Sequence, residues 1–204
     1  MVRRLLSFLV RWCGLLCVPG GALWALSPTG VYVSTFAFHT PNVFWKMFWP
    51  APLLMLLGLI GLQLRQSDRS GFLEKIGFLV AAVGLVMVMA GDIGLYWLGI
   101  DDMFIVTAPA YHTFRIGLVV LAVGSILFAV TSPRDGALPS WGLLPFVLGS
   151  LCGLVSFSRD LGTFGAALWI LFGVGWAWLG LSLAVDGFSS FVRKRRSVTA
   201  AAKS

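Results

Sequence analysis

Charged residues are scarce in this chain. Only 11% of its 204 residues are Asp, Glu, Lys or Arg, compared with about 25% in a typical soluble domain. Hydrophobic residues make up 58% of the sequence, and the mean hydropathy is +0.92. This composition excludes an ordinary soluble domain and predicts an all-α integral membrane protein.

Histidine and cysteine are also rare. With only His39 and His112, the chain cannot build a three-histidine zinc site. The odd cysteine count, with Cys13, Cys17 and Cys152 in apolar segments and no C-x-x-C spacing, excludes a disulfide framework and a redox pair. We therefore expect no metal and no cofactor.

Motifs of membrane enzymes are missing as well. The chain contains neither H-E-x-x-H nor the phosphate-binding G-x-x-x-x-G-K-[ST]. Ser125 and Ser150 follow glycines, but no histidine stands where it would face either serine. We predict no catalytic residue. An enzyme built from unfamiliar residues stays open, although the absence of a nucleophile and base pair favours a protein that is not an enzyme.

Long apolar runs dominate what is present. The run 76–99 is broken only by Asp92, and at 1.5 Å per residue it covers the roughly 30 Å hydrocarbon layer of a bilayer. Six such runs predict a single membrane domain over 1–190, a six-transmembrane-helix bundle. Its helices are expected at about 5–26, 48–64, 76–99, 111–131, 141–157 and 163–185.

The connections between these runs differ in character. Residues 27–47 form a long outer loop with few charges, and Trp45, Phe48 and Trp49 at its end predict an aromatic interfacial segment. Residues 191–204 form a basic tail. The tail carries Arg193, Lys194, Arg195 and Arg196, for which we expect contacts with anionic lipid headgroups, although anchoring of the topology alone suffices to explain them and is the favoured explanation.

The distribution of the basic residues predicts the orientation of the chain in the membrane. With six spans, eleven fall on one side of the membrane, and only Lys46, Arg115 and Arg159 fall on the other. Basic loops stay in the cytoplasm, so we predict a multi-pass protein of the cell inner (plasma) membrane with cytoplasmic N- and C-termini. The net charge of +7 then reflects topology, and we expect no nucleic-acid partner.

Glycines recur along the predicted helices at spacings that place them on one helix face. A spacing of seven is two helical turns, so such glycines form a groove for a neighbouring helix. The expected helix-packing residues are Gly77, Gly84, Gly91, Gly117, Gly124, Gly142, Gly149 and Gly153. Helices two and three also resemble helices four and five, which indicates either a parallel internal repeat or convergence of membrane sequences.

One polar constellation could carry chemistry. Asp92 and Arg115 lie near the outer ends of two helices that should be antiparallel neighbours. In a low dielectric, Asp92 must be paired with Arg115, be protonated or line a wet cavity. The candidate ligand- or ion-binding residues are Asp92, Tyr96, Asp101, Asp102, His112 and Arg115. The same residues could instead only lock two helices in register.

Two functions follow from these patterns. The glycine-striped helices favour a small membrane protein that acts by packing and binding, as an accessory, assembly or regulatory subunit or as a homo-oligomer. Its partners would be membrane lipids and other membrane subunits. The alternative is a small transporter or channel that uses an outer-facing polar site around Asp92, His112 and Arg115.

Overall fold

The structure is a computed structural model, and its described part contains helices and turns but no strand. It describes residues 12, 14–27, 44, 46–66, 71–98, 109–132, 140–158 and 162–201. The long helices are Gly14–Ser27, which we call the N-terminal helix, α3 (Pro50–Gln66), α4 (Phe72–Tyr96), α5 (Pro109–Thr131), α6 (Ser140–Ser158) and α7 (Gly162–Ala201).

The prediction of an all-helical protein is confirmed for the residues that the structure describes. Three helices are long and apolar enough to cross a membrane: α4, α5 and the Phe164–Val185 part of α7. The N-terminal helix, Pro50–Leu64 of α3 and Leu143–Phe157 of α6 are also apolar but shorter. Length and composition thus mark the chain as a membrane protein.

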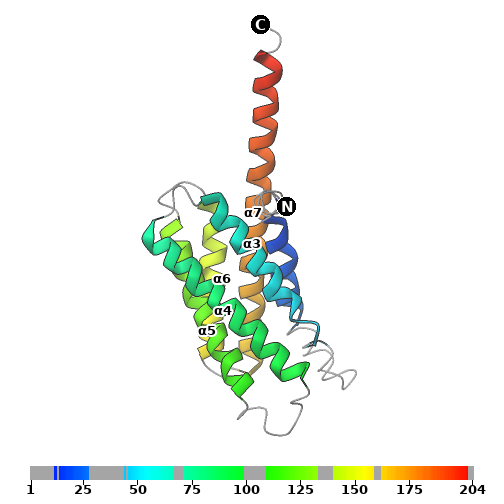
Figure 1. Ribbon diagram of the computed structural model, residues 1–204, viewed down its shortest axis with the longest axis vertical. Helices are drawn as coiled ribbons and strands as arrows, with labels where there is room; N and C mark the ends of the chain where they lie inside the picture. The colour runs from blue at the N-terminus through cyan, green and yellow to red at the C-terminus, as the bar shows by residue number, and fades with distance from the viewer. Residues whose placement is uncertain are drawn as a thin grey trace.

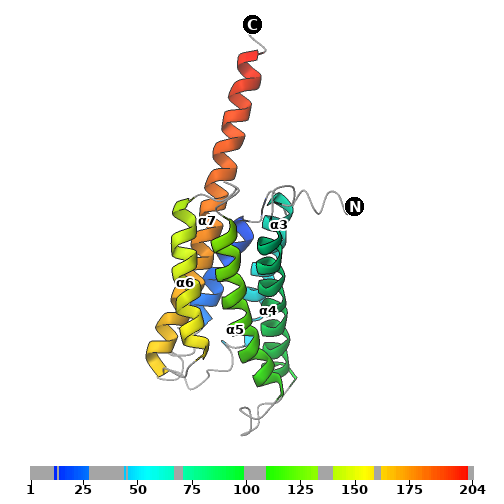
Figure 2. The ribbon, with the colours of Figure 1, turned by 90° about the vertical axis from the view of Figure 1, so that its left-hand side faces the viewer.

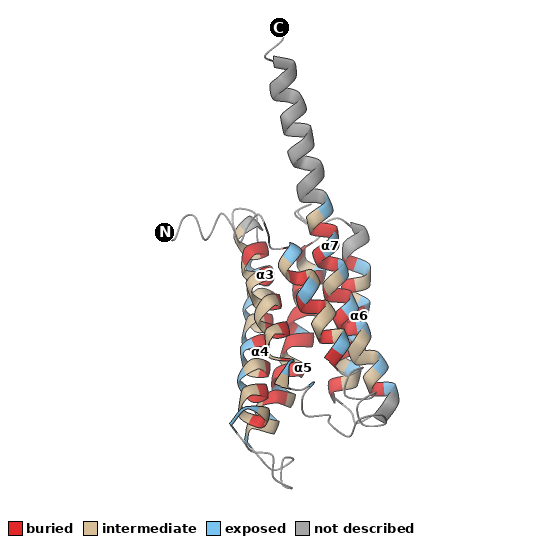
Figure 3. Cartoon of the chain, turned by 90° about the vertical axis from the view of Figure 1, so that its right-hand side faces the viewer, coloured by how far each residue is buried: buried red, intermediate tan, exposed pale blue. Residues whose placement is uncertain are grey.

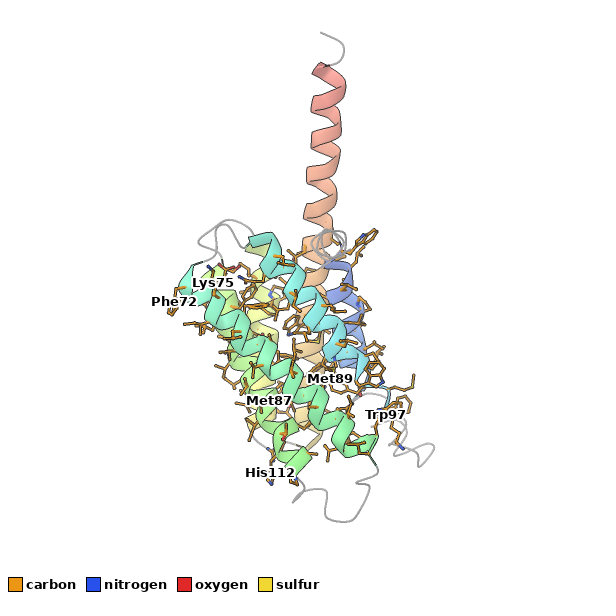
Figure 4. All side chains as sticks on the ribbon, in the orientation of Figure 1. Phe72, Lys75, Met87, Met89, Trp97 and His112 are labelled. Carbon is orange, nitrogen blue, oxygen red and sulfur yellow. The ribbon has the colours of Figure 1, made fainter. Side chains whose placement is uncertain are left out.

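Consecutive helices lie side by side and run in opposite directions (Figures 1 and 2). α4 packs on α3 and α5, and α6 packs on α5 and α7. The N-terminal helix joins the first and last of these, because Gly20 contacts Met55 of α3 and Gly14 contacts Gly180 of α7. Figure 4 shows Lys75 at one end of the helices and His112 and Trp97 at the other. We call these the Lys75 end and the His112 end.

Buried and exposed positions alternate along the helices (Figure 3), and many of the exposed positions carry large apolar side chains. On α4, Leu79, Val83 and Val86 are exposed, while Leu85 and Val88 are fully buried. A water-soluble protein does not expose apolar surface on this scale. The outward faces are therefore suited to lipid.

Among the bounds of α3 to α7, two differ from the predicted ones by four residues or more. α4 begins at Phe72 instead of 76, because Gly71 caps it and the Lys75 backbone N–H donates to the Gly71 carbonyl at 3.2 Å. The acidic Glu74 in the first turn also favours a helix start. The charges that suggested a loop here are compatible with a helix end.

The end of α7 differs more from its predicted position. We expected its helix to end near 185, but it continues to Ala201 and passes beyond the other helices at the Lys75 end (Figure 1). Lys, Arg and Ala are good helix formers, and a single interior glycine such as Gly187 costs only about 1 kcal/mol. The predicted basic tail is thus a helical continuation of the last helix.

Two predicted features stay predictions. Most of the outer loop at 27–47 lies outside the described residues. In the proposed repeat, Gly84 and Gly149 occupy equivalent positions, and each faces the helix that follows its own, α5 and α7 respectively. Either duplication or convergence accommodates that similarity.

Candidate functional site

Glycines bring α4 and α5 into backbone contact over most of their length. At successive levels the close contact is supplied alternately by α4 and α5, in a constant antiparallel register. The paired residues are Gly77 with Phe128, Ala81 with Gly124, Gly84 with Leu121, Val88 with Gly117 and Gly91 with Phe114. We call this contact the glycine seam. It fixes the position of every side chain on the two helices relative to one another.

Asp92 stands immediately beside the last level of the seam. Its side chain is fully buried, and neither carboxyl oxygen has a hydrogen-bond partner among the described residues. The neighbouring turns of the same helix face present Val88 and Leu95, which are also buried. Asp92 is one turn from the last residue of α4, about 6 Å along the axis from the His112 end. It is thus an isolated acid in an apolar interior.

Arg115 does not approach this acid in the structure. Its guanidinium donates a 3.5 Å hydrogen bond to the carbonyl of Phe157 and another to the hydroxyl of Tyr111, and it lies 5.8 Å from the Tyr111 ring centre. Phe157 is in the last turn of α6, where carbonyls lack helical partners and cations are favourable. Arg115 therefore caps α6, and the ion pair considered for Asp92 is not the arrangement found.

The other polar candidates are spread over the His112 end. Tyr96 is the final residue of α4 and packs, half-buried, against the apolar core. His112 is exposed on α5, and its ring lies 5.9 Å from that of Tyr111. Asp101 and Asp102 lie outside the described residues. Among the described residues, no three His, Cys, Asp or Glu side chains gather into a group that could hold a metal ion.

Four aromatic rings fill the interior at the depth of Asp92. Gly91 contacts Phe114, and the Trp97 indole donates a 3.2 Å hydrogen bond to the carbonyl of Lys46, which holds the 46–48 segment beside the last turn of α4. We call Trp24, Phe48, Phe114 and Trp169 the aromatic cluster. Their ring centres are 4.8 to 6.2 Å apart. Phe48, expected in an interfacial belt, is buried.

Sequence analysis missed this cluster because its rings come from four separate segments. It also missed a second set of packing glycines, although the signal was available. Gly14 and Gly21 are seven apart, as are Gly173 and Gly180, and the two pairs bring the N-terminal helix against α7. The spacing rule that selected Gly84 would have selected them too.

The remaining predicted residues are placed as follows. Gly149 contacts Leu171 and Gly175 of α7, and Gly153 contacts the Phe172 ring. Gly142 lies in the first turn of α6. Residues 193–196 are within α7, but their side chains are outside the described part, so lipid contact stays a prediction.

Comparison of the chain with protein-family models, with curated proteins and with solved structures finds no match in any of the three. The function proposed below therefore rests on the geometry of the chain itself.

Proposed function

We propose that this chain is a small multi-pass membrane protein that binds a cation at Asp92 and passes it across the membrane. The observation that supports this is the isolation of Asp92, which is fully buried and has no hydrogen-bond partner among the described residues. Burying a polar group without a partner costs several kcal/mol. Ionisable residues inside membrane helices are rare, and those that occur mark ion and substrate pathways.

The glycines favour this proposal over one based only on packing with other subunits. Gly84, Gly149 and Gly173 each contact a different helix of the same chain. The small-residue grooves that suggested docking of partners are thus used for folding. They leave the buried carboxyl of Asp92 as a feature that helix packing does not account for.

We further propose that all six helices span the inner membrane and that both termini are cytoplasmic. The three shorter helices pack side by side with the three longer ones. The start of α4 with Lys75 and the basic extension of α7 are at the same end of the molecule (Figures 1 and 4). A common basic end is what the positive-inside rule requires of such a topology.

The test is cation flux in proteoliposomes. Purified wild type, Asp92→Asn and Arg115→Gln are reconstituted, and the uptake of protons, sodium, potassium and tetraphenylphosphonium is followed. We expect at least one of these cations to enter wild-type vesicles, and we expect Asp92→Asn to abolish that uptake. Arg115→Gln is the matched control, because Arg115 lies on the neighbouring helix at the same end and contacts α6 instead of Asp92.

Two results would contradict the proposal. One is that no cation enters wild-type vesicles faster than it enters protein-free vesicles. The other is that Asp92→Asn and wild type transport every cation equally well.

A second candidate is an accessory or assembly subunit, and the shape of α7 favours it. This helix continues to Ala201, beyond the ends of the other helices (Figure 1). A projecting helix that carries the sequence Arg193 to Arg196 could dock on another membrane subunit or on anionic lipid.

A further inference from the structure

We infer that the cation bound by Asp92 is a proton, and that metal ions and organic cations are excluded from this site. The inference rests on the proposed function and names its transported species. It starts from the same buried carboxyl, which shares its helix face with Leu85, Val88 and Leu95. An isolated ionised carboxylate in such surroundings needs a positive charge beside it.

The surroundings do not provide a coordination shell for a metal ion. Calcium takes six to eight oxygen ligands, and magnesium needs a near-ideal octahedron. Asp92 offers one carboxyl, and the part of the chain that the structure describes contains no group of three or more His, Cys, Asp or Glu side chains that could hold a metal ion. The α4 and α5 backbones beside it are engaged in their own helices. Metal binding here would leave most coordination positions empty.

The packing of the aromatic cluster also disfavours an organic cation. A quaternary or protonated amine binds over the face of a ring, within about 6 Å of its centre. In the aromatic cluster, the Trp24 and Phe48 ring centres are 4.8 Å apart, and those of Trp24 and Trp169 are 5.6 Å apart and stacked. The rings of Phe48 and Phe114 are 6.2 Å apart. Trp24, Phe48 and Phe114 are also buried, so a cation over one of these rings would have to displace a neighbouring side chain.

A proton is the one cation that needs neither added ligands nor added volume. It bonds to a carboxyl oxygen and converts the costly ion into a neutral acid. Asp92 can hold it without any movement of the rings around it.

The charged and titratable groups near Asp92 leave the carboxyl free to exchange this proton. From α5, Arg115 is directed to Phe157 and Tyr111, and His112 is exposed. From the segment before α3, Lys46 is half-buried. Tyr96 lies one turn further along α4 itself. The described parts of the N-terminal helix and of α3 with placed side chains carry no Asp, Glu, His, Lys or Arg.

The position of Asp92 also indicates the side from which the proton enters. The other buried acid of α4 is Glu74, eighteen residues away, which is five full turns and the same helix face. The residues between them on this face include Ala81, Leu85 and Val88, all buried and apolar. Asp92, in contrast, is one turn from the end of α4. The proton therefore exchanges with the His112 end in this conformation.

The experiment uses dicyclohexylcarbodiimide, an apolar reagent that adds to a protonated carboxyl within a membrane. The acid O–H adds across one C=N bond of the reagent: the carboxyl oxygen bonds to carbon and the proton passes to nitrogen. Full-length protein in native membrane vesicles is treated, and the modified residue is located by mass spectrometry. Asp92→Asn and Glu74→Gln serve as matched variants, because both acids are buried on the same face of α4.

We expect the reagent to label Asp92 in wild type and in Glu74→Gln. Once the carboxyl ionises, the rate should fall about tenfold for each further pH unit. Excess sodium, potassium, calcium or tetraphenylphosphonium should leave the rate unchanged. Protection by any of these ions would overturn the inference while leaving a cation site at Asp92. Absence of labelling at Asp92 at every pH would overturn it as well.

The labelling assay tests the proton site, and the flux assay tests the transport function, so one hypothesis can be contradicted without the other. If Asp92 is labelled in the expected way but flux does not depend on it, the proton site stands and the transport function is wrong.

Discussion

Replacing Gly84 with alanine tests the glycine seam at its central level. A Cβ atom at this position would lie 2.6 Å from the Cα and 2.8 Å from the Cβ of Leu121. Ordinary contact begins at 3.4 Å, and the nearest atoms belong to the α5 backbone, which cannot rotate away. The two helices must therefore move apart, and the contacts at neighbouring levels of the seam weaken with them.

Two opposing contributions set the change in the free energy of unfolding that Gly84→Ala causes. Overpacking of a well-packed contact costs about 1–3 kcal/mol. Alanine favours the helix over glycine by up to about 1 kcal/mol. Because the clash is with backbone and the whole seam must open, we expect the upper part of the first range, and thus a net loss of about 1–2 kcal/mol in the free energy of unfolding.

Unfolding in mixed detergent micelles, followed by tryptophan fluorescence as the fraction of denaturing detergent rises, measures this loss. Gly71→Ala is the control, because a Cβ there meets nothing within 4 Å and the backbone is extended. If Gly84→Ala were as stable as wild type and Gly71→Ala, the seam would not hold α4 and α5 together, and the placement of Asp92 would lose its basis.

The remaining predictions concern topology and partners. In a background without native cysteines, Ser197→Cys should react with a membrane-impermeant maleimide only in inside-out vesicles, and His112→Cys only in right-side-out vesicles; the reverse pattern would invert the proposed orientation. If the chain acts as an accessory subunit, native electrophoresis of mild detergent extracts should show it in a larger complex, from which deletion of residues 187–204 releases it. A free monomer before and after the deletion would exclude that role.

For the candidate site, the sequence predicted which residue is important but not which residues it contacts. Asp92 could be selected from the sequence because a single acid in an apolar run stands out against its surroundings. Whether Asp92 contacts Arg115 could not be predicted, since two residues at similar depth on adjacent helices can face each other or face apart. The rotation of α4 and α5 decides this, and Gly84 and Gly91 set that rotation through contacts with Leu121 and Phe114.

The sequence by itself determined that the chain is helical and belongs in a membrane, and it determined the approximate limits of the helices. Hydropathy and length are local properties, and in a bilayer the backbone has to satisfy its hydrogen bonds within each helix. It could not determine where α7 ends, because one glycine after the apolar run does not stop a helix.

Only the tertiary structure decided which surfaces meet. Gly21 of the first helix lies against Gly173 and Ala177 of the last, a contact between segments about 150 residues apart in the chain. The aromatic cluster likewise joins Trp24 and Trp169. Contacts of this kind depend on how all the helices close around a common interior. Hydrophobicity does not mark the inward face, because the apolar part of each helix is apolar on every side, and glycine spacing marks a packing face without showing which helix meets it.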